Sequence, residues 1–190
     1  KKTLAGNISK SFKIKDKDNY FFKKVLFYHV DQYFKSLRKH PIREHSIGRR
    51  NIILKDMWVN YQYQNEFNPF HHHGGVYSFA IWLKIPYDWR EQQKLPFLDG
   101  MNDDDKKAGL FEFEYQDILG GINHYAYRLD SSMEGRMLFF PSGLKHGVYP
   151  FYGTDEPRIS VSGNLWVTSD DGLEEESSES KGRTFIYGPS

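Results

Sequence analysis

The spacing of apolar residues along this chain changes near residue 50. Before that point, apolar side chains recur every three or four positions, at Phe22, Leu26, Val30, Phe34 and Leu37. This spacing predicts one amphipathic helix over residues 17–40. We expect Asp18 to cap its start and Pro41 to end it after His40. The apolar stripe should pack on the outside of a sheet.

From Asn51 the period becomes two, which is typical of strands. The segment "MWVNYQYQ" (57–64) alternates apolar and polar residues, and "VYSFAIWLKI" (76–85) is almost continuously apolar. Further strand-like segments follow at residues 110–115, 124–129, 136–141, 146–151 and 158–167, separated by Gly- and Ser-containing turns. Short strands with no helix among them predict a mainly β fold of the sandwich or jelly-roll class.

The 190 residues predict a single domain with three segments. Residues 1–50 should form a helical support, and residues 51–169 the jelly-roll core. Residues 170–190 contain an acidic, Ser-rich stretch at 170–180 and a strand-like segment at 183–188.

Composition and charge limit the possible chemistry. The chain has no cysteine, so a metal would have to bind His, Asp or Glu. Residues 1–50 carry 14 Lys and Arg against 4 Asp and Glu, although the net charge of the whole chain is only +1. We interpret this basic region as a solvated helix face beside an acidic barrel, not as a nucleic-acid surface. Neither a long apolar run nor a signal-peptide pattern is present, so we expect no membrane partner and a cytoplasmic location.

Three consecutive histidines, His71 to His73, precede the apolar strand at 76–85. On an extended backbone, residues two apart face the same side, so His71 and His73 can converge while His72 points away. Two neutral imidazoles make half of a site for a divalent transition metal. A solvated polar loop would explain the same triplet equally well.

A second pattern lies in "GRMLFFPSGLKHGVYP" (135–150). Its spacing of Gly135, Pro141, Gly143 and His146 resembles the second sequence motif of the cupins. That resemblance implies a double-stranded β-helix, a jelly roll in which His146 faces an early pair of histidines across a metal. Two features depart from the cupin pattern. Residues 77–79 hold no Glu, and Pro150 stands where an Asn is expected.

A third pattern follows twelve residues after His146, where Arg158 and Ser160 are separated by one residue. This pair resembles the 2-oxoglutarate-binding residues of the Fe(II)- and 2-oxoglutarate-dependent oxygenases. A carboxylate suits a bidentate guanidinium together with a hydroxyl group. Strand alternation places Ser162 and Asn164 on the same face, and a row of polar residues there is consistent with a charged ligand.

The resemblance extends over residues 57–164. This region, and the opening "LAGNISKSF", are similar to small oxygenases of marine tailed bacteriophages, which are described as prolyl-4-hydroxylase-like. The resemblance implies Fe(II), 2-oxoglutarate and O2, with succinate and CO2 as co-products. It also implies hydroxylation of a substrate, with peptidyl proline as the family-level expectation, in the host cytoplasm if the chain is phage-encoded.

The metal ligands can be assigned in three ways. The superfamily usually has a carboxylate two residues after its first histidine, but here that residue is His73. We favour the set His71, His73 and His146. A carboxylate such as Glu112 or Glu114 could replace His73. A halogenase-like arrangement could instead use His73 and Gly75, with His71 idle.

Other residues have weaker expectations. Cofactor binding is expected of Arg158 and Ser160, joined by Tyr61 and Asn164, and no catalytic residue is expected beyond the metal ligands. The residues expected to be structural or on the surface are His29, His40, His45, His124, Trp58, Trp82 and Trp166. A peptide or small-molecule substrate is the expected partner, while the oligomeric state does not follow from the sequence. The alternative function is a cupin-like, metal-binding jelly roll without redox turnover, acting as a structural or interaction module.

Overall fold

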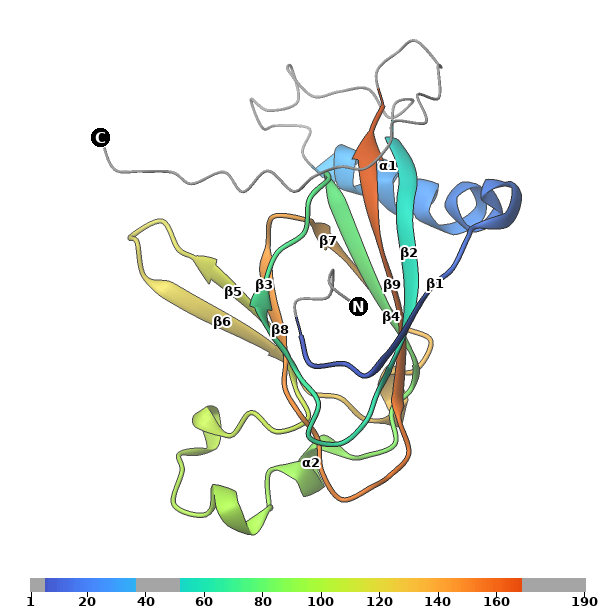
Figure 1. Cartoon of the computed structure of the whole chain (residues 1–190). Coiled ribbons are helices and arrows are strands. Elements are labelled where there is room, and N and C mark those ends of the chain that lie inside the picture. The colour runs from blue at the N-terminus through green and yellow to red at the C-terminus, as the bar shows by residue number, and fades with distance from the viewer. Residues whose placement is uncertain (1–5, 37–51, 169–190) are drawn as a thin grey trace.

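The computed structural model describes residues 6–36 and 52–168, which form two antiparallel sheets (Figure 1). The five-stranded sheet has the order β1 (Lys10–Lys13), β2 (Ile52–Gln62), β9 (Arg158–Val167), β4 (Tyr77–Lys84) and β7 (Met137–Pro141). The four-stranded sheet has the order β3 (Asn68–His71), β8 (Lys145–Val148), β5 (Phe111–Gln116) and β6 (Ile122–Tyr127). The chain passes repeatedly between the two sheets, which is the predicted jelly roll.

Each of the seven strand-like segments predicted between residues 57 and 167 overlaps one strand of the structure. Two strands were missed, β1 and β3, each only four residues long. The segment β1 is "KSFK" and β3 is "NPFH", so neither has an alternation long enough to detect. Both strands pair with partners distant in sequence, β1 with β2 and β3 with β8.

The N-terminal helix packs on the five-stranded sheet, as its stripe predicts. It runs through a 3₁₀ turn (Lys17–Asn19), a π-helical segment (Phe22–Leu26) and α1 (Phe27–Ser36). Leu26 and Val30 are fully buried in a cluster with Tyr77, Phe79 and Leu165. Because this cluster lies between helix and sheet, the helix supports the barrel from outside (Figure 1).

The start of this helix differs from the prediction. Asp16, not Asp18, caps it, because the Asp16 carboxylate accepts hydrogen bonds from the backbone N–H groups of Phe21 and Phe22, each at 2.8 Å. Asp18 instead adopts a left-handed backbone conformation with φ of 57°. The predicted helix end at His40 and Pro41 lies outside the described residues.

A second apolar cluster fills part of the space between the two sheets. Its buried members are Trp82, Ile85, Phe111, Phe113, Leu129 and Phe140. The rest of the space between the sheets contains a cavity.

Among the described residues, no helix is long and apolar enough to span a membrane. The acidic stretch at 170–180 and the strand expected at 183–188 lie outside the described residues.

Candidate functional site

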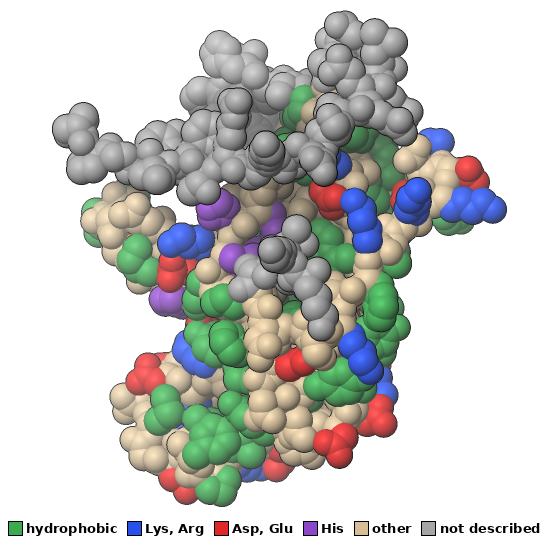
Figure 2. All heavy atoms as spheres, viewed as in Figure 1, with side chains coloured by type: hydrophobic (Ala, Val, Ile, Leu, Met, Phe, Trp, Pro, Cys, Tyr) green, Lys and Arg blue, Asp and Glu red, His purple; other side chains and the backbone are tan. Residues whose placement is uncertain are grey.

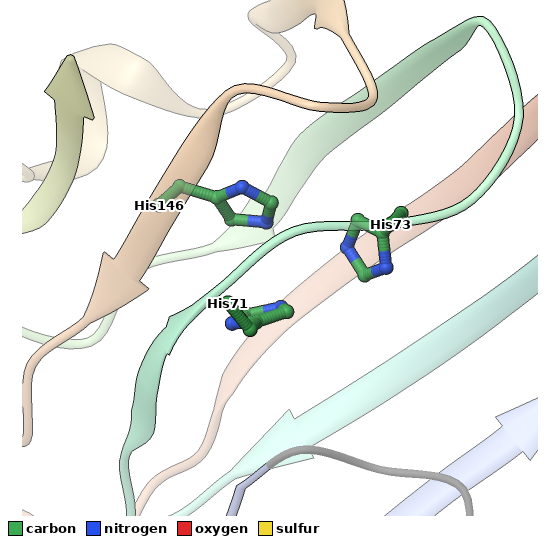
Figure 3. A group of neighbouring side chains, drawn as sticks. All are labelled: His71, His73 and His146. Carbon is green, nitrogen blue, oxygen red and sulfur yellow. The ribbon is translucent and has the colours of Figure 1, made fainter. Parts of the chain in front are cut away.

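The three histidines singled out in the sequence meet in space (Figure 3). His71 ends β3 and pairs directly with His146 on β8, while His73 lies in the loop after β3. One ring nitrogen of each histidine lies within 4.8 Å of the others. The ring centroids of His71 and His146 are 4.4 Å apart, and that of His73 lies 4.9 and 5.1 Å from them. The structure thus brings the early and late sequence motifs together.

The loop that carries His73 is held at both ends. The His73 backbone N–H donates to the carbonyl of Ser142 at 2.9 Å, in the turn before His146. Gly75 has φ of 99°, and a Cβ there would lie 2.5 Å from the Leu165 carbonyl oxygen. Only glycine suits that position. The next residue, Val76, donates its backbone N–H to the same Leu165 carbonyl at 2.8 Å, so hydrogen bonds at both ends hold the loop that carries His73.

Hydrogen bonds fix the tautomers of two of the rings. Nδ1 of His71 lies 2.7 Å from the Pro69 carbonyl oxygen, and Nδ1 of His146 lies 3.0 Å from that of Leu144. Because a carbonyl oxygen can only accept, each Nδ1 carries the proton. The Nε2 atoms therefore keep their lone pairs, as metal binding requires.

The histidines are held uncharged. Burial lowers the pKa of His71, and burial together with the neighbouring histidines lowers the pKa of His73 to about 4. Burial is also the main cause that lowers the pKa of His146 to about 3. The rings of Phe111 and Phe140, with centroids 5.6 and 5.1 Å from that of His146, provide this apolar surrounding. Neutral imidazoles at neutral pH are ready to bind a metal.

The two carboxylates considered as alternative ligands face away from the histidines. In the register of β5 and β8, Phe113 is opposite His146, so Glu112 and Glu114 project from the other face of the sheet. Glu112 accepts hydrogen bonds from Lys107 at 2.7 Å and from the Tyr149 hydroxyl at 2.9 Å. Glu114 pairs with Lys145 at 3.1 Å. Neither belongs to this cluster, so the geometry argues against that alternative.

His71 is a member of the cluster, which argues against the halogenase-like arrangement in which it would be idle. His72 also borders the neighbouring cavity, but it does not belong to the cluster. The three-histidine set is therefore the one that the geometry favours.

A cavity of about 700 Å³ lies beside the histidines, between the two sheets. Histidine atoms are visible on this face of the molecule in Figure 2. The wall formed by β9 presents Arg158, Ser160, Ser162 and Asn164, the four residues that strand alternation predicted to share a face. The Asn164 side chain accepts a hydrogen bond from the Ser78 hydroxyl at 2.8 Å, which fixes its amide.

Arg158 is the first residue of β9 and of this row of polar side chains, and it is only 2% exposed. Its guanidinium donates to the Tyr87 hydroxyl, to Oε1 of Gln62 at 2.6 Å and to the Tyr149 carbonyl oxygen at 3.4 Å. All three partners are uncharged, and burial raises the pKa of Tyr87, which keeps its phenol protonated. Within residues 6–36 and 52–168, no carboxylate forms an ion pair with Arg158. A buried, unneutralised guanidinium facing a cavity is suited to receive a carboxylate.

One of the predicted cofactor-binding residues, Tyr61, does not face the cavity. Its side chain lies on the opposite face of β2 and contacts Phe12, with ring centroids 6.0 Å apart. Its neighbours Asn60 and Gln62 face the cavity instead. The amide oxygen of Asn60 is buried and has no hydrogen-bond partner within the described part of the chain.

Gln62 and Tyr87 are the functional candidates that sequence reasoning missed. The signal for Gln62 was the polar alternation of "VNYQYQ", in which Asn60 and Gln62 share a face. No local signal marks Tyr87, since it reaches Arg158 only through the fold.

The remaining aromatic and histidine residues mostly occupy structural positions. Trp82 is buried in the core, but Trp58 lines the cavity with its ring centroid 5.7 Å from that of His73. His29 stacks on Phe139, and His124 lies 3.6 Å from Glu112. Trp166 packs against the glycine loop at residues 74–75. His40 and His45 lie outside the described residues.

Comparison with known proteins gives a family match. A family model described as "Putative 2OG-Fe(II) oxygenase" matches residues 56–164, more than half of the chain, including the three histidines and Arg158. None of the curated proteins compared with the sequence matches it.

Several solved structures are similar to this chain at low sequence identity. An oxidoreductase of the 2OG-Fe(II) oxygenase family from Burkholderia pseudomallei is 13% identical with a TM-score of 0.44, covering 73% of this chain. This chain spans 57% of that protein, little more than half of its length. A Pseudomonas putida prolyl-4-hydroxylase is 14% identical, with 86% of this chain and 78% of that chain covered and a TM-score of 0.44. A cupin domain from Bordetella pertussis is 10% identical, with coverages of 65% and 88% and a TM-score of 0.31.

Proposed function

Because this chain belongs to the 2OG-Fe(II) oxygenase family, we propose that it is a 2-oxoglutarate-dependent oxygenase that holds Fe(II) through His71, His73 and His146. One observation carries the proposal: three neutral imidazoles converge on one side of a cavity whose wall also holds a buried guanidinium, and no carboxylate of the described residues pairs with it. Three nitrogen donors from neutral imidazoles fit a divalent first-row metal.

Arg158 and Ser160 would hold the distal carboxylate of 2-oxoglutarate. The Arg158 side chain is already fixed by Gln62 and Tyr87, so little rotational freedom is lost when the ligand binds. Both of these partners are uncharged, and they leave the positive charge available to the ligand. Asn60 and Asn164 line the same wall, and their amide N–H groups are donors that a carboxylate could accept from.

When bound, Fe(II) with 2-oxoglutarate and O2 supplies the oxidising chemistry, and the cosubstrate leaves as succinate and CO2. The protein contributes position and shielding. Trp82, Phe111 and Phe140 form an apolar part of the cavity wall, which limits water near the histidines. The backbone carbonyls of Pro69 and Leu144 keep the Nε2 atoms of His71 and His146 directed as ligands.

For the substrate, we propose a peptidyl proline side chain that becomes hydroxylated. A cavity of about 700 Å³ falls in the size range that takes a drug-sized ligand, so a small diacid leaves room for a substrate group. Ser9, Ser11 and Lys13 of the N-terminal segment border this cavity and offer polar contacts. The same proposal includes three points that rest on the sequence resemblance. They are the phage origin, the cytoplasmic location and the assignment of the chain to a single oxygenase domain.

A second candidate is a metal-binding jelly roll without turnover, which the absence of the usual carboxylate ligand favours. Two measurements on the full chain distinguish the two candidate functions. Calorimetry under anaerobic conditions, with Mn(II) in place of iron, should show 2-oxoglutarate binding to the full chain. Aerobic incubation with Fe(II) and 2-oxoglutarate should then produce succinate. Metal binding without 2-oxoglutarate binding would overturn the oxygenase proposal and support the second candidate.

A further inference from the structure

The two sheets have four edge strands, and one of them differs from the rest. Edge strands are commonly protected from pairing by Lys or Pro. Of the edges in the described part of the chain, β1 carries two Lys residues, while β3 and β7 each contain a Pro. The fourth edge, β6, has the sequence "INHYAY", with neither Pro, Lys, Arg, Asp nor Glu. By this criterion β6 is an unprotected edge.

The alternation of hydrogen-bonded and non-bonded residue pairs in the β5–β6 hairpin shows which backbone groups of β6 do not bond to β5. The Asp117 N–H donates to the Gly121 carbonyl oxygen at 2.9 Å, next to the register pair Gln116 and Ile122. Antiparallel ladders alternate between bonded and non-bonded pairs, so the backbone N–H and C=O groups of Ile122, His124 and Ala126 point away from β5. Within residues 6–36 and 52–168, β5 is the one strand that pairs with β6.

The end of this hairpin displays apolar side chains on a fixed turn. The Asp117 carboxylate accepts hydrogen bonds from the N–H groups of Leu119 and Gly121, each at 2.9 Å. Ile118 and Leu119 are 100% and 92% exposed, and Ile122 on β6 is 61% exposed. The hairpin projects from the body of the molecule at the left of Figures 1 and 2. Exposed apolar side chains beside an unpaired strand edge are typical of an interaction surface.

We propose that β6 pairs with β6 of a second copy of this chain, antiparallel about a two-fold axis, to form a continuous eight-stranded sheet across a homodimer. A register centred on His124 places Ile122 opposite Ala126 of the second copy. In this register the outward N–H and C=O groups of Ile122, His124 and Ala126 all form hydrogen bonds between the two copies. Because the strand carries no Lys, Arg, Asp or Glu, it places no permanent like charges opposite each other, and a two-fold interface is self-complementary by construction.

The test is the association state of the full chain. Sedimentation equilibrium over a range of concentrations should show a monomer–dimer equilibrium for the wild type. His124→Lys puts two ammonium groups directly opposite each other in the dimer, whereas in one copy the new Lys lies near Glu112. Like charges directly opposite are destabilising, so the dimer dissociation constant should rise by about tenfold or more. Gln116→Lys adds the same charge to β5 and is the matched control, with a dissociation constant close to wild type.

Hydrogen exchange gives a readout that needs no variant. The amides of Ile122, His124 and Ala126 should gain protection as protein concentration rises, while those of β1 should not. A wild type that remains monomeric at high concentration overturns the proposal. So does a dimer that His124→Lys and Gln116→Lys leave equally intact, because its interface must then lie elsewhere.

Discussion

At the scale of single residues, Arg158 offers the sharpest test of the proposed function. Arg158→Ala removes two charge-assisted bonds and leaves a buried carboxylate without a counter-ion, so 2-oxoglutarate binding should weaken by about 10²-fold or more. Ser160→Ala should give a smaller loss, and metal affinity should hardly change in either variant. Anaerobic calorimetry with Mn(II) measures both affinities. Arg136→Ala, which removes an exposed guanidinium, is the control. Equal binding by the Arg136 and Arg158 variants would refute the assignment.

The metal ligands make a separate prediction at this scale. His71→Ala and His146→Ala should each abolish binding of Mn(II) or Fe(II), because each removes one of three nitrogen donors. His72→Ala should leave metal binding nearly intact and serves as the control within the same triplet. Equilibrium dialysis against the metal measures the outcome. A site that needs His72 and tolerates the loss of His73 would show that the ligand assignment is wrong by one residue.

At the scale of elements, the N-terminal helix stabilises the barrel through its buried stripe. Leu26→Ala removes side-chain contacts in a fully buried position and should lower the free energy of unfolding by about 2–5 kcal/mol. Tyr28→Ala, on the exposed side of the same helix, should change it little. Urea denaturation followed by circular dichroism compares the two variants.

Deletion of the helix extends this prediction. A chain that lacks residues 18–39 should unfold or aggregate, because the outer face of the five-stranded sheet would then be exposed to water. If the shortened chain stays soluble and folded and loses only a binding partner, the helix is a docking element and not a structural support.

At the scale of the whole molecule, the buried histidines link stability to pH. The pKa values of His73 and His146, about 4 and 3, lie below the ordinary value of 6.5. As pH falls below about 6.5 the unfolded chain binds protons that the folded chain resists, so the metal-free protein should lose stability between pH 6.5 and about 4. Urea denaturation at pH 7 and pH 5 measures the loss. His146→Gln should show a smaller difference between the two pH values, and an equal difference would contradict the prediction.

The sequence alone determined those features that local periodicity encodes. Alternation over residues 57–64 and 158–167 was sufficient to predict strands, and it also identified the polar face of β9. The histidine spacing predicted His71 and His73 as neighbours, because residues two apart on an extended chain share a side. The helix stripe around Leu26 and Val30 was predictable for the same reason, since its period of 3.6 is a local property.

Only the tertiary structure decided which segments meet and which face of each strand looks inward. The register of β5 against β8 directs Glu112 away from the histidines, and the pairing of β2 with β9 puts Gln62 beside Arg158 in place of Tyr61. The free edge of β6 likewise follows from the order of strands in the sheet. Such features depend on contacts between segments far apart in the chain. A local pattern carries no information about them, because register and burial are properties of pairs of strands.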